Sequence, residues 1–217
     1  CCHENSRTTV LVRQAELMVV ANSAQTLNSS PIIEKSKAII IGPGLGQDNW
    51  SAELFDLVLK FTQPKVVDAD ALRLLAAKPI KKQQWILTPH PGEAAALLSC
   101  RVEDVEADRF SAVKNIAQQY GGICVLKGAG TLVSDGKVIW VNSTGNPGMA
   151  SGGMGDVLSG IIGALILQTG DLFIAARLAV YIHGRAADIM AKKSGQIGLL
   201  ASDLYPEIQR LINAQSY

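Results

Sequence analysis

Short, mostly apolar runs alternate with helical patterns over the first two-thirds of the chain. The runs at 38–41, 65–68, 85–87 and 123–126 do not alternate apolar with polar residues, which is typical of strands buried on both faces of a parallel sheet. The segment 48–61 instead repeats its apolar residues at helical spacing. Strands that alternate with helices predict an α/β fold, with helices on both faces of a mostly parallel sheet.

The rest of the pattern combines one hairpin with further helices. Two apolar runs within 131–141 flank Asp135-Gly136, a dipeptide that is frequent in hairpin turns. The further helices are expected at 69–76, 92–98, 104–120, 156–168, 171–191 and 201–212. No repeat or Pro/Ser-rich linker interrupts the sequence, and 217 residues suit one core. We therefore expect a single domain over residues 1–217.

Charge and cysteine content exclude several classes of protein. The 20 Lys and Arg side chains balance 19 Asp and Glu, and the net charge of +1 gives no electrostatic reason to expect nucleic acid or an anionic membrane as partner. The longest apolar stretch, near 157–167, is broken by Ser159 and Gly160 and is shorter than the roughly 20 residues that cross a bilayer. Four cysteines without metal-ligand spacing predict no disulfide scaffold and no zinc site, but a buried Cys124 and a reducing, cytoplasmic compartment.

The segment 142–156, N-S-T-G-N-P-G-M-A-S-G-G-M-G-D, carries the strongest functional signal. It leads into an apolar helix, and a helix N-terminus presents unpaired N–H groups and a partial positive charge. Glycines allow a phosphate to come close to those amides. No Gly-Lys-Ser/Thr follows, so the segment is not a Walker A loop. Asp156 is a candidate base beside a bound phosphate, and its alternative role is that of a helix N-cap.

A second candidate site is Lys127-Gly128-Ala129-Gly130-Thr131, directly after an expected strand. A cation, two glycines and a hydroxyl within five residues can hold nucleotide phosphates or line an adenosine pocket. The alternative is a tight turn into the hairpin, with the Lys127 side chain in solvent.

Two further loops follow expected strands, at the edge of an open α/β sheet where ligands bind. In one loop, two prolines restrict the backbone around His90, which can hydrogen-bond a substrate, while Glu93 begins the next helix. The alternative is a surface histidine and a glutamate that interacts with the helix dipole. The other loop contains Gly44 and Gly46 and is either a ligand-binding turn or a simple chain reversal. His183, within an apolar helical pattern, is expected to pack rather than react.

Together and in this order, the motifs resemble the NAD(P)H-hydrate dehydratase family of the ribokinase-like superfamily. The matching segments are Ile41-Gly42-Pro43-Gly44-Leu45-Gly46, Val67-Asp68-Ala69-Asp70-Ala71-Leu72, Thr88-Pro89-His90-Pro91-Gly92-Glu93, Lys127-Gly128-Ala129-Gly130-Thr131 and the run from Thr144 to Asp156. The resemblance implies a ribokinase-like three-layer α/β/α sandwich. It also implies an enzyme that uses ADP or ATP with Mg²⁺ to dehydrate NADHX or NADPHX, the forms of NADH and NADPH hydrated at C6, and that releases AMP or ADP and phosphate.

The resemblance also assigns roles to individual residues. Asp156 is the catalytic candidate and contacts the hydrated nicotinamide. The implied nucleotide contacts are Lys127, Gly128, Ala129, Gly130, Thr131 and Gly155. The implied NAD(P)HX contacts are Gly44, Gly46, His90 and Asp156. Glu93 matches the acid that helps, indirectly, to organise Mg²⁺ and phosphate.

These residues suit the implied reaction. Hydroxide is a poor leaving group, so the C6 hydroxyl is first phosphorylated, and the ring nitrogen then expels it as phosphate. Asp156 would accept the hydroxyl proton during attack on the terminal phosphoryl group. The amides of Gly153, Met154 and Gly155 would form an anion hole for the transferring oxygens. Mg²⁺ and Lys127 would offset the remaining charge.

Departures from the family pattern concern mainly the N-terminus. The family carries a first strand and a glycine-rich turn that have no counterpart before Cys1, so we expect this domain to lack that region.

The resemblance further implies a homo-oligomer, often a tetramer, and in many bacterial relatives a fused NAD(P)HX epimerase domain. Two alternatives stay open: a small-molecule kinase of the same superfamily that acts on a vitamin or sugar alcohol, and a nucleotide-binding module without activity. The choices of ADP or ATP, and of NADHX or NADPHX, also stay open.

Overall fold

The computed structural model describes residues 2–13, 16–20, 27 and 31–213. Within these residues one sheet has six strands, and each strand lies beside its neighbour in the sequence. The strands are β1 (Ile39–Ile41), β2 (Lys65–Val67), β3 (Trp85–Leu87), β4 (Ile123–Leu126), β5 (Leu132–Ser134) and β6 (Ile139–Val141). Strands β1 to β4 are parallel, whereas β5 pairs antiparallel with both β4 and β6. The expected mostly parallel sheet with a hairpin is confirmed.

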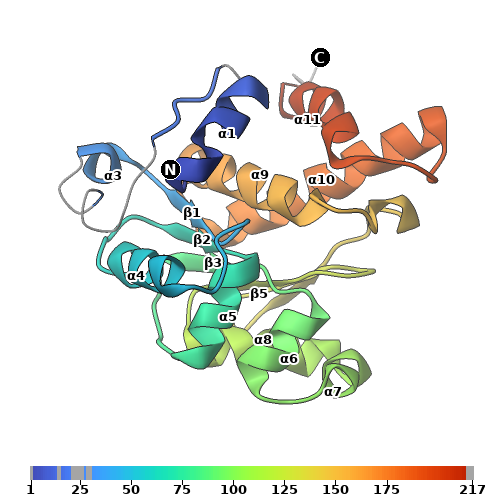
Figure 1. The fold of residues 1–217 in the computed structure, drawn as a ribbon. Coiled ribbons are helices and arrows are strands. Elements are labelled where there is room, and N and C mark those ends of the chain that lie inside the picture. Colours follow the sequence, from blue (N-terminus) through green and yellow to red (C-terminus); the bar gives the residue numbers. More distant parts are fainter. Residues whose placement is uncertain (1, 14–15, 21–26, 28–30, 214–217) are drawn as a thin grey trace.

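Helices cover both faces of the sheet and give three layers (Figure 1). One layer contains α4 (Asn49–Val58), α5 (Ala69–Ala77), α6 (Pro91–Leu98), α7 (Val102–Ala107) and α8 (Arg109–Tyr120). The opposite layer contains α9 (Met154–Thr169) and α10 (Leu172–Ser194), with α11 (Tyr205–Ile212) in contact with α10. The shorter elements are α1 (Arg7–Arg13), α3 (Pro31–Lys35), η1 (Glu4–Ser6), η2 (Pro147–Met149) and η3 (Ala201–Leu204). None of the helices in the described ranges combines the length and apolar character that a membrane span requires.

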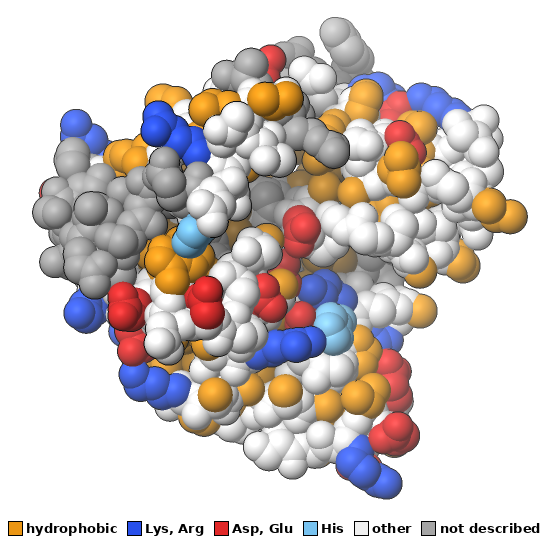
Figure 2. Space-filling view, in the orientation of Figure 1, with side chains coloured by type: hydrophobic (Ala, Val, Ile, Leu, Met, Phe, Trp, Pro, Cys, Tyr) orange, Lys and Arg blue, Asp and Glu red, His pale blue; other side chains and the backbone are white. Residues whose placement is uncertain are grey.

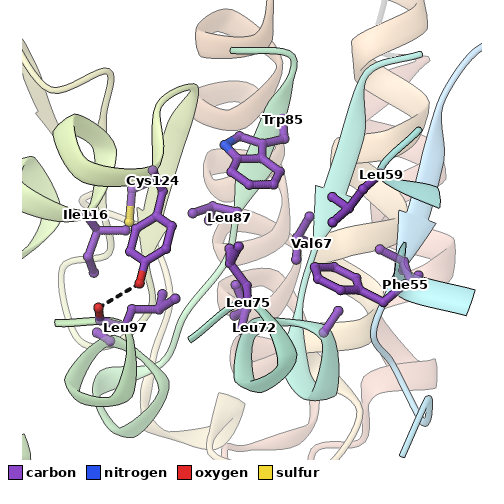
Figure 3. Packing of buried hydrophobic residues seen from close by; sticks show 14 of the residues in the cluster. Phe55, Leu59, Val67, Leu72, Leu75, Trp85, Leu87, Leu97, Ile116 and Cys124 are labelled. Carbon is purple, nitrogen blue, oxygen red and sulfur yellow. Dashed lines mark hydrogen bonds between the residues drawn. The ribbon is translucent and has the colours of Figure 1, made fainter. Parts of the chain in front are cut away.

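The side chains of the parallel strands fill two separate cores, one on each face of the sheet. Val67 and Leu87 lie in the core that α4, α5, α6 and α8 cover (Figure 3). Their neighbours Val66 and Ile86 point to the opposite face and pack with α9 and α10. Because both faces are buried, the strands need no polar side, which explains the lack of alternation in the sequence. Cys124 is buried as predicted, and this burial raises the pKa of its thiol.

The expectation of one helix over 104–120 is wrong, because the backbone breaks at Asp108. Its φ of −144° and ψ of 78° are not helical, and its carboxylate accepts a 2.9 Å hydrogen bond from the Ser111 N–H. Asp108 therefore separates α7 from α8 and caps the second helix. Val105 of α7 and Ile116 of α8 belong to the same core. The apolar spacing thus continues across the break, and the sequence pattern hides it.

The carboxyl ends of the four parallel strands lie at one edge of the sheet. The segments that follow them there are the glycine turn 42–46 after β1, Asp68 after β2, the loop 88–90 after β3 and Lys127 after β4. Four of the segments that the sequence analysis singled out therefore meet at one place in the fold.

Candidate functional site

A buried ion pair lies at the carboxyl edge of the sheet. The ammonium group of Lys127 is 2.9 Å from Asp68 Oδ1 and 3.7 Å from Glu93 Oε2. The side chains of Asp68 and Glu93 are 1% and 7% exposed, and that of Lys127 is 19% exposed. The alternative in which Lys127 extends into solvent is therefore wrong. The two carboxylates hold its ammonium group in place.

Asp68 also connects this ion pair to the helix that follows the glycine-rich segment. Its Oδ2 accepts a 2.6 Å hydrogen bond from the Ser159 hydroxyl of α9, and its Oδ1 accepts a second bond from the Ala69 N–H at 2.8 Å. Ser159 lies three residues after Asp156, so the two side chains are neighbours on the surface of α9. One carboxylate therefore joins the ends of β2 and β4 to the first turns of α9.

The N-terminus of α9 lies beside the Lys127 ammonium group. Gly153 is the N-cap and has a φ of 84°, a left-handed conformation that glycine adopts readily. The first helical hydrogen bond runs from the Val157 N–H to the Gly153 carbonyl at 3.0 Å, so the N–H groups of Met154 and Gly155 have no acceptor within the helix. A Cβ on Gly155 would lie 3.3 Å from Lys127 Nζ. An anion bound here would meet both the helix amides and the ammonium group.

Asp156 is the third residue of α9, and it is exposed. Its alternative role as the N-cap is wrong, because Gly153 takes that position. Partial burial raises the pKa of the Asp156 carboxyl, the negative charge of Asp68 raises it further, and the Lys127 ammonium group offsets part of this rise. A raised pKa makes the carboxylate a better proton acceptor. The side chain is thus both accessible and suited to act as a base.

His90 and Glu93 form a capping box at the start of α6. His90 Nδ1 accepts hydrogen bonds from the N–H groups of Gly92 at 3.0 Å and Glu93 at 3.3 Å, and Glu93 Oε2 accepts one from the His90 N–H at 2.8 Å. The His90 side chain is half exposed, with Nε2 3.3 Å from Glu93 Oε1. The helix start therefore holds the imidazole in a fixed orientation, while part of the ring can reach a ligand.

Arg109 of α8 shapes the loop between β4 and β5, and the sequence analysis missed it. Its guanidinium group donates hydrogen bonds to the carbonyl oxygens of Leu126 at 3.4 Å, Lys127 at 3.3 Å and Ala129. Gly128 lies so close that a Cβ there would be 2.8 Å from Arg109 Nη2. A guanidinium group has several N–H donors in one plane, so Arg109 can hold these three carbonyl groups together. The ammonium group of a lysine could not do so.

The outer part of the same loop is accessible. Gly128, Ala129 and Gly130 are exposed. The Thr131 hydroxyl donates a 3.0 Å hydrogen bond to the Gly128 carbonyl, which closes the turn. Gly130 has a φ of 61° and so takes a left-handed conformation within it. The loop that begins at Lys127 therefore presents its backbone to solvent directly beside the ion pair.

The glycine turn after β1 borders the same edge. The Gly46 N–H donates a 2.8 Å hydrogen bond to Asp70 Oδ2, which ties the turn to the first residues of α5. Gly44 has a φ of 61°, and no atom of the described ranges lies within 4 Å of the position that a Cβ would take. Its backbone is therefore open to a ligand.

Carboxylates outnumber cations among the groups named at this edge. Those of Asp68 and Glu93 lie 2.9 and 3.7 Å from the ammonium group of Lys127, and the charges of Asp68 and Lys127 both act on the carboxyl of Asp156. Carboxylate oxygens are the ligands that Mg²⁺ prefers, but Mg²⁺ also keeps several waters or phosphate oxygens. In the part of the chain that the structure describes, no three His, Cys, Asp or Glu side chains are grouped to hold a metal. A Mg²⁺ at this edge would therefore need phosphate oxygens or waters as further ligands, with Glu93 among the carboxylates that could orient them.

The surface is hollowed between the layer of α10 and α11 and the layer of α6 and α8 (Figure 2). Acidic, basic and histidine side chains gather around this hollow. A mixed set of charges at a concave surface is typical of a site for a small charged ligand.

The fold brings together Lys127, Glu93 and Asp156, which the sequence analysis identified in three separate motifs. Asp68 and Ser159 were not identified as site residues. For Asp68 a signal exists, since an acid directly after a buried strand lies at the ligand-binding edge of an α/β sheet. For Ser159 we find none, because a serine within an apolar helix has no distinctive pattern.

Several known proteins resemble this chain over most of its length. A family model described as NAD(P)H-hydrate dehydratase matches residues 1–210. The bifunctional NAD(P)H-hydrate repair enzyme of Vibrio cholerae is 51% identical over 211 residues, which are 97% of this chain and 42% of that protein. The ADP-dependent (S)-NAD(P)H-hydrate dehydratase of Neisseria meningitidis is 41% identical over 81% of this chain and 63% of its own length. The chain therefore spans about two-fifths of the bifunctional relative.

Solved structures show the same fold. The ADP/ATP-dependent NAD(P)H-hydrate dehydratase of Bacillus subtilis, co-crystallised with ATP/Mg²⁺, superposes with a TM-score of 0.86 at 31% identity. The match covers 97% of this chain and 76% of the other. The expected ribokinase-like architecture is confirmed, since a ribokinase-like superfamily protein from Enterococcus faecalis also superposes, with a TM-score of 0.84.

Proposed function

From the finding that this chain belongs to the NAD(P)H-hydrate dehydratase family, we propose that it catalyses the dehydration of hydrated NADH or NADPH, driven by ADP or ATP. The observation that carries the proposal is the position of Asp156. Its carboxylate stands in the first turn of α9, next to helix amides that have no helical acceptor and close to the Lys127 ammonium group. A base and an anion site are thus adjacent, as phosphorylation of a hydroxyl requires.

Asp156 accepts the proton of the C6 hydroxyl while the hydroxyl oxygen attacks the terminal phosphorus of the nucleotide. The bond from that phosphorus to the bridging oxygen breaks, and AMP leaves from ADP, or ADP from ATP. The lone pair of the ring nitrogen then expels phosphate from C6, and loss of the C5 proton restores the ring double bond. The raised pKa of Asp156 supports its role as proton acceptor at the first step.

The anion hole consists of the amides of Gly153, Met154 and Gly155, which stabilise the charge on the transferring oxygens. Lys127 contributes its ammonium group to the same phosphates. Mg²⁺, when bound, neutralises phosphate charge, and Glu93 is the carboxylate best placed to orient its water ligands. Each of these groups lies at the start of α9, at the start of α6 or directly after β4.

The two ligands bind on either side of Asp156 in this proposal. The nucleotide contacts the exposed loop formed by Lys127, Gly128, Ala129, Gly130 and Thr131, together with Gly155. The hydrated nicotinamide nucleotide contacts Gly44, Gly46 and His90. The open backbone at Gly44 and the fixed, half-exposed imidazole of His90 support this division.

The proposal extends to the setting of the domain. The relatives named bifunctional repair enzymes are more than twice as long as the matched region, and we propose that this domain works together with an NAD(P)HX epimerase. We also propose a homo-oligomer and a cytoplasmic location, since Cys2, Cys100 and Cys124 are free thiols, which suit a reducing compartment.

Product analysis tests the function against its nearest alternative. The chain is incubated with NADHX, Mg²⁺ and either ADP or ATP, and the products are separated by chromatography. The dehydratase yields NADH and inorganic phosphate. A small-molecule kinase of the same fold would form no NADH from NADHX, and in a parallel incubation with a vitamin or sugar alcohol it would form a stable phosphate ester. A module that only binds nucleotide would leave both reactants unchanged.

A further inference from the structure

We propose that Asp68 is a positioning residue of this enzyme: it holds the Lys127 ammonium group against the first turn of α9, where the nucleotide phosphates bind. The inference rests on the proposed function and deepens it, because it names the group that orders the phosphate site before the nucleotide arrives. Asp68 does not touch substrate in this account. It acts through Lys127 and Ser159.

The first argument is burial. The Asp68 side chain is 1% exposed, yet its hydrogen bonds are directed to the site: to Lys127 Nζ at 2.9 Å, the Ser159 hydroxyl at 2.6 Å and the Ala69 N–H at 2.8 Å. A buried carboxylate costs free energy unless such partners satisfy it. An uncharged side chain could join β2 to α9 equally well. We therefore relate the carboxylate of Asp68 to the ammonium group of Lys127.

The second argument is backbone strain. Ala69, directly after Asp68, has a φ of 46°, in the left-handed region that residues with a Cβ rarely adopt. On the other side, Gly42 packs on the Asp68 carbonyl so closely that no side chain fits there. Strained conformations persist where the surrounding structure over-determines them, and they cluster at functional sites. Here the strained residue directly follows Asp68, whose carboxylate contacts Lys127 at the end of β4 and Ser159 in α9.

The third argument is the number of donors on Lys127. An ammonium group has three N–H donors. Asp68 receives one of them at 2.9 Å, while Glu93 Oε2, at 3.7 Å, lies beyond hydrogen-bond distance. Two donors thus stay available for phosphate oxygens. A lysine that is already held loses little conformational freedom when the nucleotide binds.

The variant Asp68→Asn tests the proposal. Asparagine keeps the size and the bond to Ser159 but no longer attracts the ammonium group. We expect the KM for the nucleotide to rise about tenfold, which is the order of one charge-assisted hydrogen bond. The KM for NADHX should stay within about twofold, because the proposed contacts of NADHX lie elsewhere. The matched control is Asp104→Asn, which removes a surface carboxylate that pairs with Arg101 and should leave both values unchanged.

A double-mutant cycle separates positioning from a general structural role. In the Lys127→Ala background, Asp68→Asn should have little further effect on nucleotide affinity, because its target is gone. Equal losses in both backgrounds would overturn the proposal. So would a nucleotide affinity of Asp68→Asn equal to that of the wild type.

Two further measurements keep the proposal testable. Calorimetric titration with nucleotide and Mg²⁺ needs no turnover, so a wild-type chain that binds nucleotide but does not dehydrate NADHX contradicts the proposed function alone. A wild-type chain that binds no nucleotide contradicts both. If Asp68→Asn does not fold, Ser159→Ala replaces it, because this variant removes only the hydrogen bond to Asp68 Oδ2. We expect its nucleotide affinity to fall about threefold. An unchanged affinity would overturn the proposal.

Discussion

Gly42 and Asp68 are in direct backbone contact at the carboxyl edge of the sheet. A Cβ on Gly42 would lie 1.7 Å from the Asp68 carbonyl oxygen and 2.7 Å from its carbonyl carbon, and the φ of Gly42 is 127°. The end of β1 thus presses on the residue that follows β2. A side chain at position 42 would therefore collide with the backbone of Asp68.

This contact predicts that Gly42→Ala destabilises the fold strongly. The methyl group would overlap backbone atoms that cannot shift without moving β2, so we expect a loss of about 3 kcal/mol in the free energy of unfolding. Urea unfolding measures it. Gly160→Ala is the matched control, because nothing lies within 4 Å of a Cβ there and the residue is inside α9. The control should be neutral or more stable, and an equally mild effect of Gly42→Ala would contradict the packing described.

Arg109 is predicted to control nucleotide affinity from outside the ligand site. Arg109→Lys keeps the charge but cannot reach the carbonyl groups of Leu126, Lys127 and Ala129 together. We expect nucleotide affinity to fall about fivefold, through loss of about one hydrogen bond, with Arg109→Lys nearly as affected as Arg109→Ala. Calorimetry reads the affinity. The control is Arg101→Lys, which changes an arginine that pairs with Asp104 at the surface. If Arg109→Lys bound nucleotide as tightly as the wild type, the loop would not depend on the guanidinium group.

Lys127 itself is predicted to bind phosphate. Lys127→Ala removes the ammonium group beside the α9 amides, and we expect nucleotide affinity to fall at least about tenfold. The loss should shrink for AMP, which lacks the terminal phosphates. Lys137→Ala, at the exposed turn between β5 and β6, is the matched control for loss of one positive charge. Equal affinities of the two variants would remove Lys127 from the nucleotide site.

His183 gives a prediction about acid stability. It is buried in α10, its Nε2 has no hydrogen-bond partner among the residues that the structure describes, and burial lowers its pKa from 6.5 to about 4. In the unfolded chain the imidazole is protonated below its usual pKa, whereas in the folded chain it stays neutral. The contribution of His183 to the free energy of unfolding is therefore fully present above pH 6.5, and it is lost as the pH falls toward 4.

The size of this effect is about 3 kcal/mol over that pH range. We expect His183→Gln to be less stable at neutral pH and to lose less stability on acidification than the wild type. Urea unfolding of both proteins at several pH values measures the difference. Parallel curves for the two proteins would show that His183 does not titrate in this way.

Local patterns were sufficient to predict the strands, the hairpin and the loops that follow the parallel strands. Residues such as Val66 and Val67 reveal a strand because a short stretch buried on both faces has a local signature. The break at Asp108 escaped prediction, because capping changes the backbone without interrupting the apolar spacing.

The internal contacts of the site could not be predicted from such patterns. Asp68 meets Lys127 across 59 residues and Ser159 across 91 residues. A pairing of this kind depends on how β2, β4 and α9 pack, and no spacing in the sequence encodes it. The same holds for Arg109, which reaches the loop that begins at Lys127 from the helix layer. The motifs indicated a candidate site, and only the fold showed that Asp68, Ser159 and Arg109 contact its residues.

The central claim is that Asp156 removes the hydroxyl proton of NAD(P)HX as the nucleotide phosphorylates it. The most direct test follows the recovery of reduced-nicotinamide absorbance from NADHX with ADP or ATP and Mg²⁺, together with phosphate release, for the wild type and for Asp156→Asn. We predict equal amounts of NADH and phosphate from the wild type, and a loss of at least about a hundredfold in rate for the variant, with nucleotide affinity unchanged by calorimetry. An Asp156→Asn protein that keeps most of the wild-type rate would contradict the account.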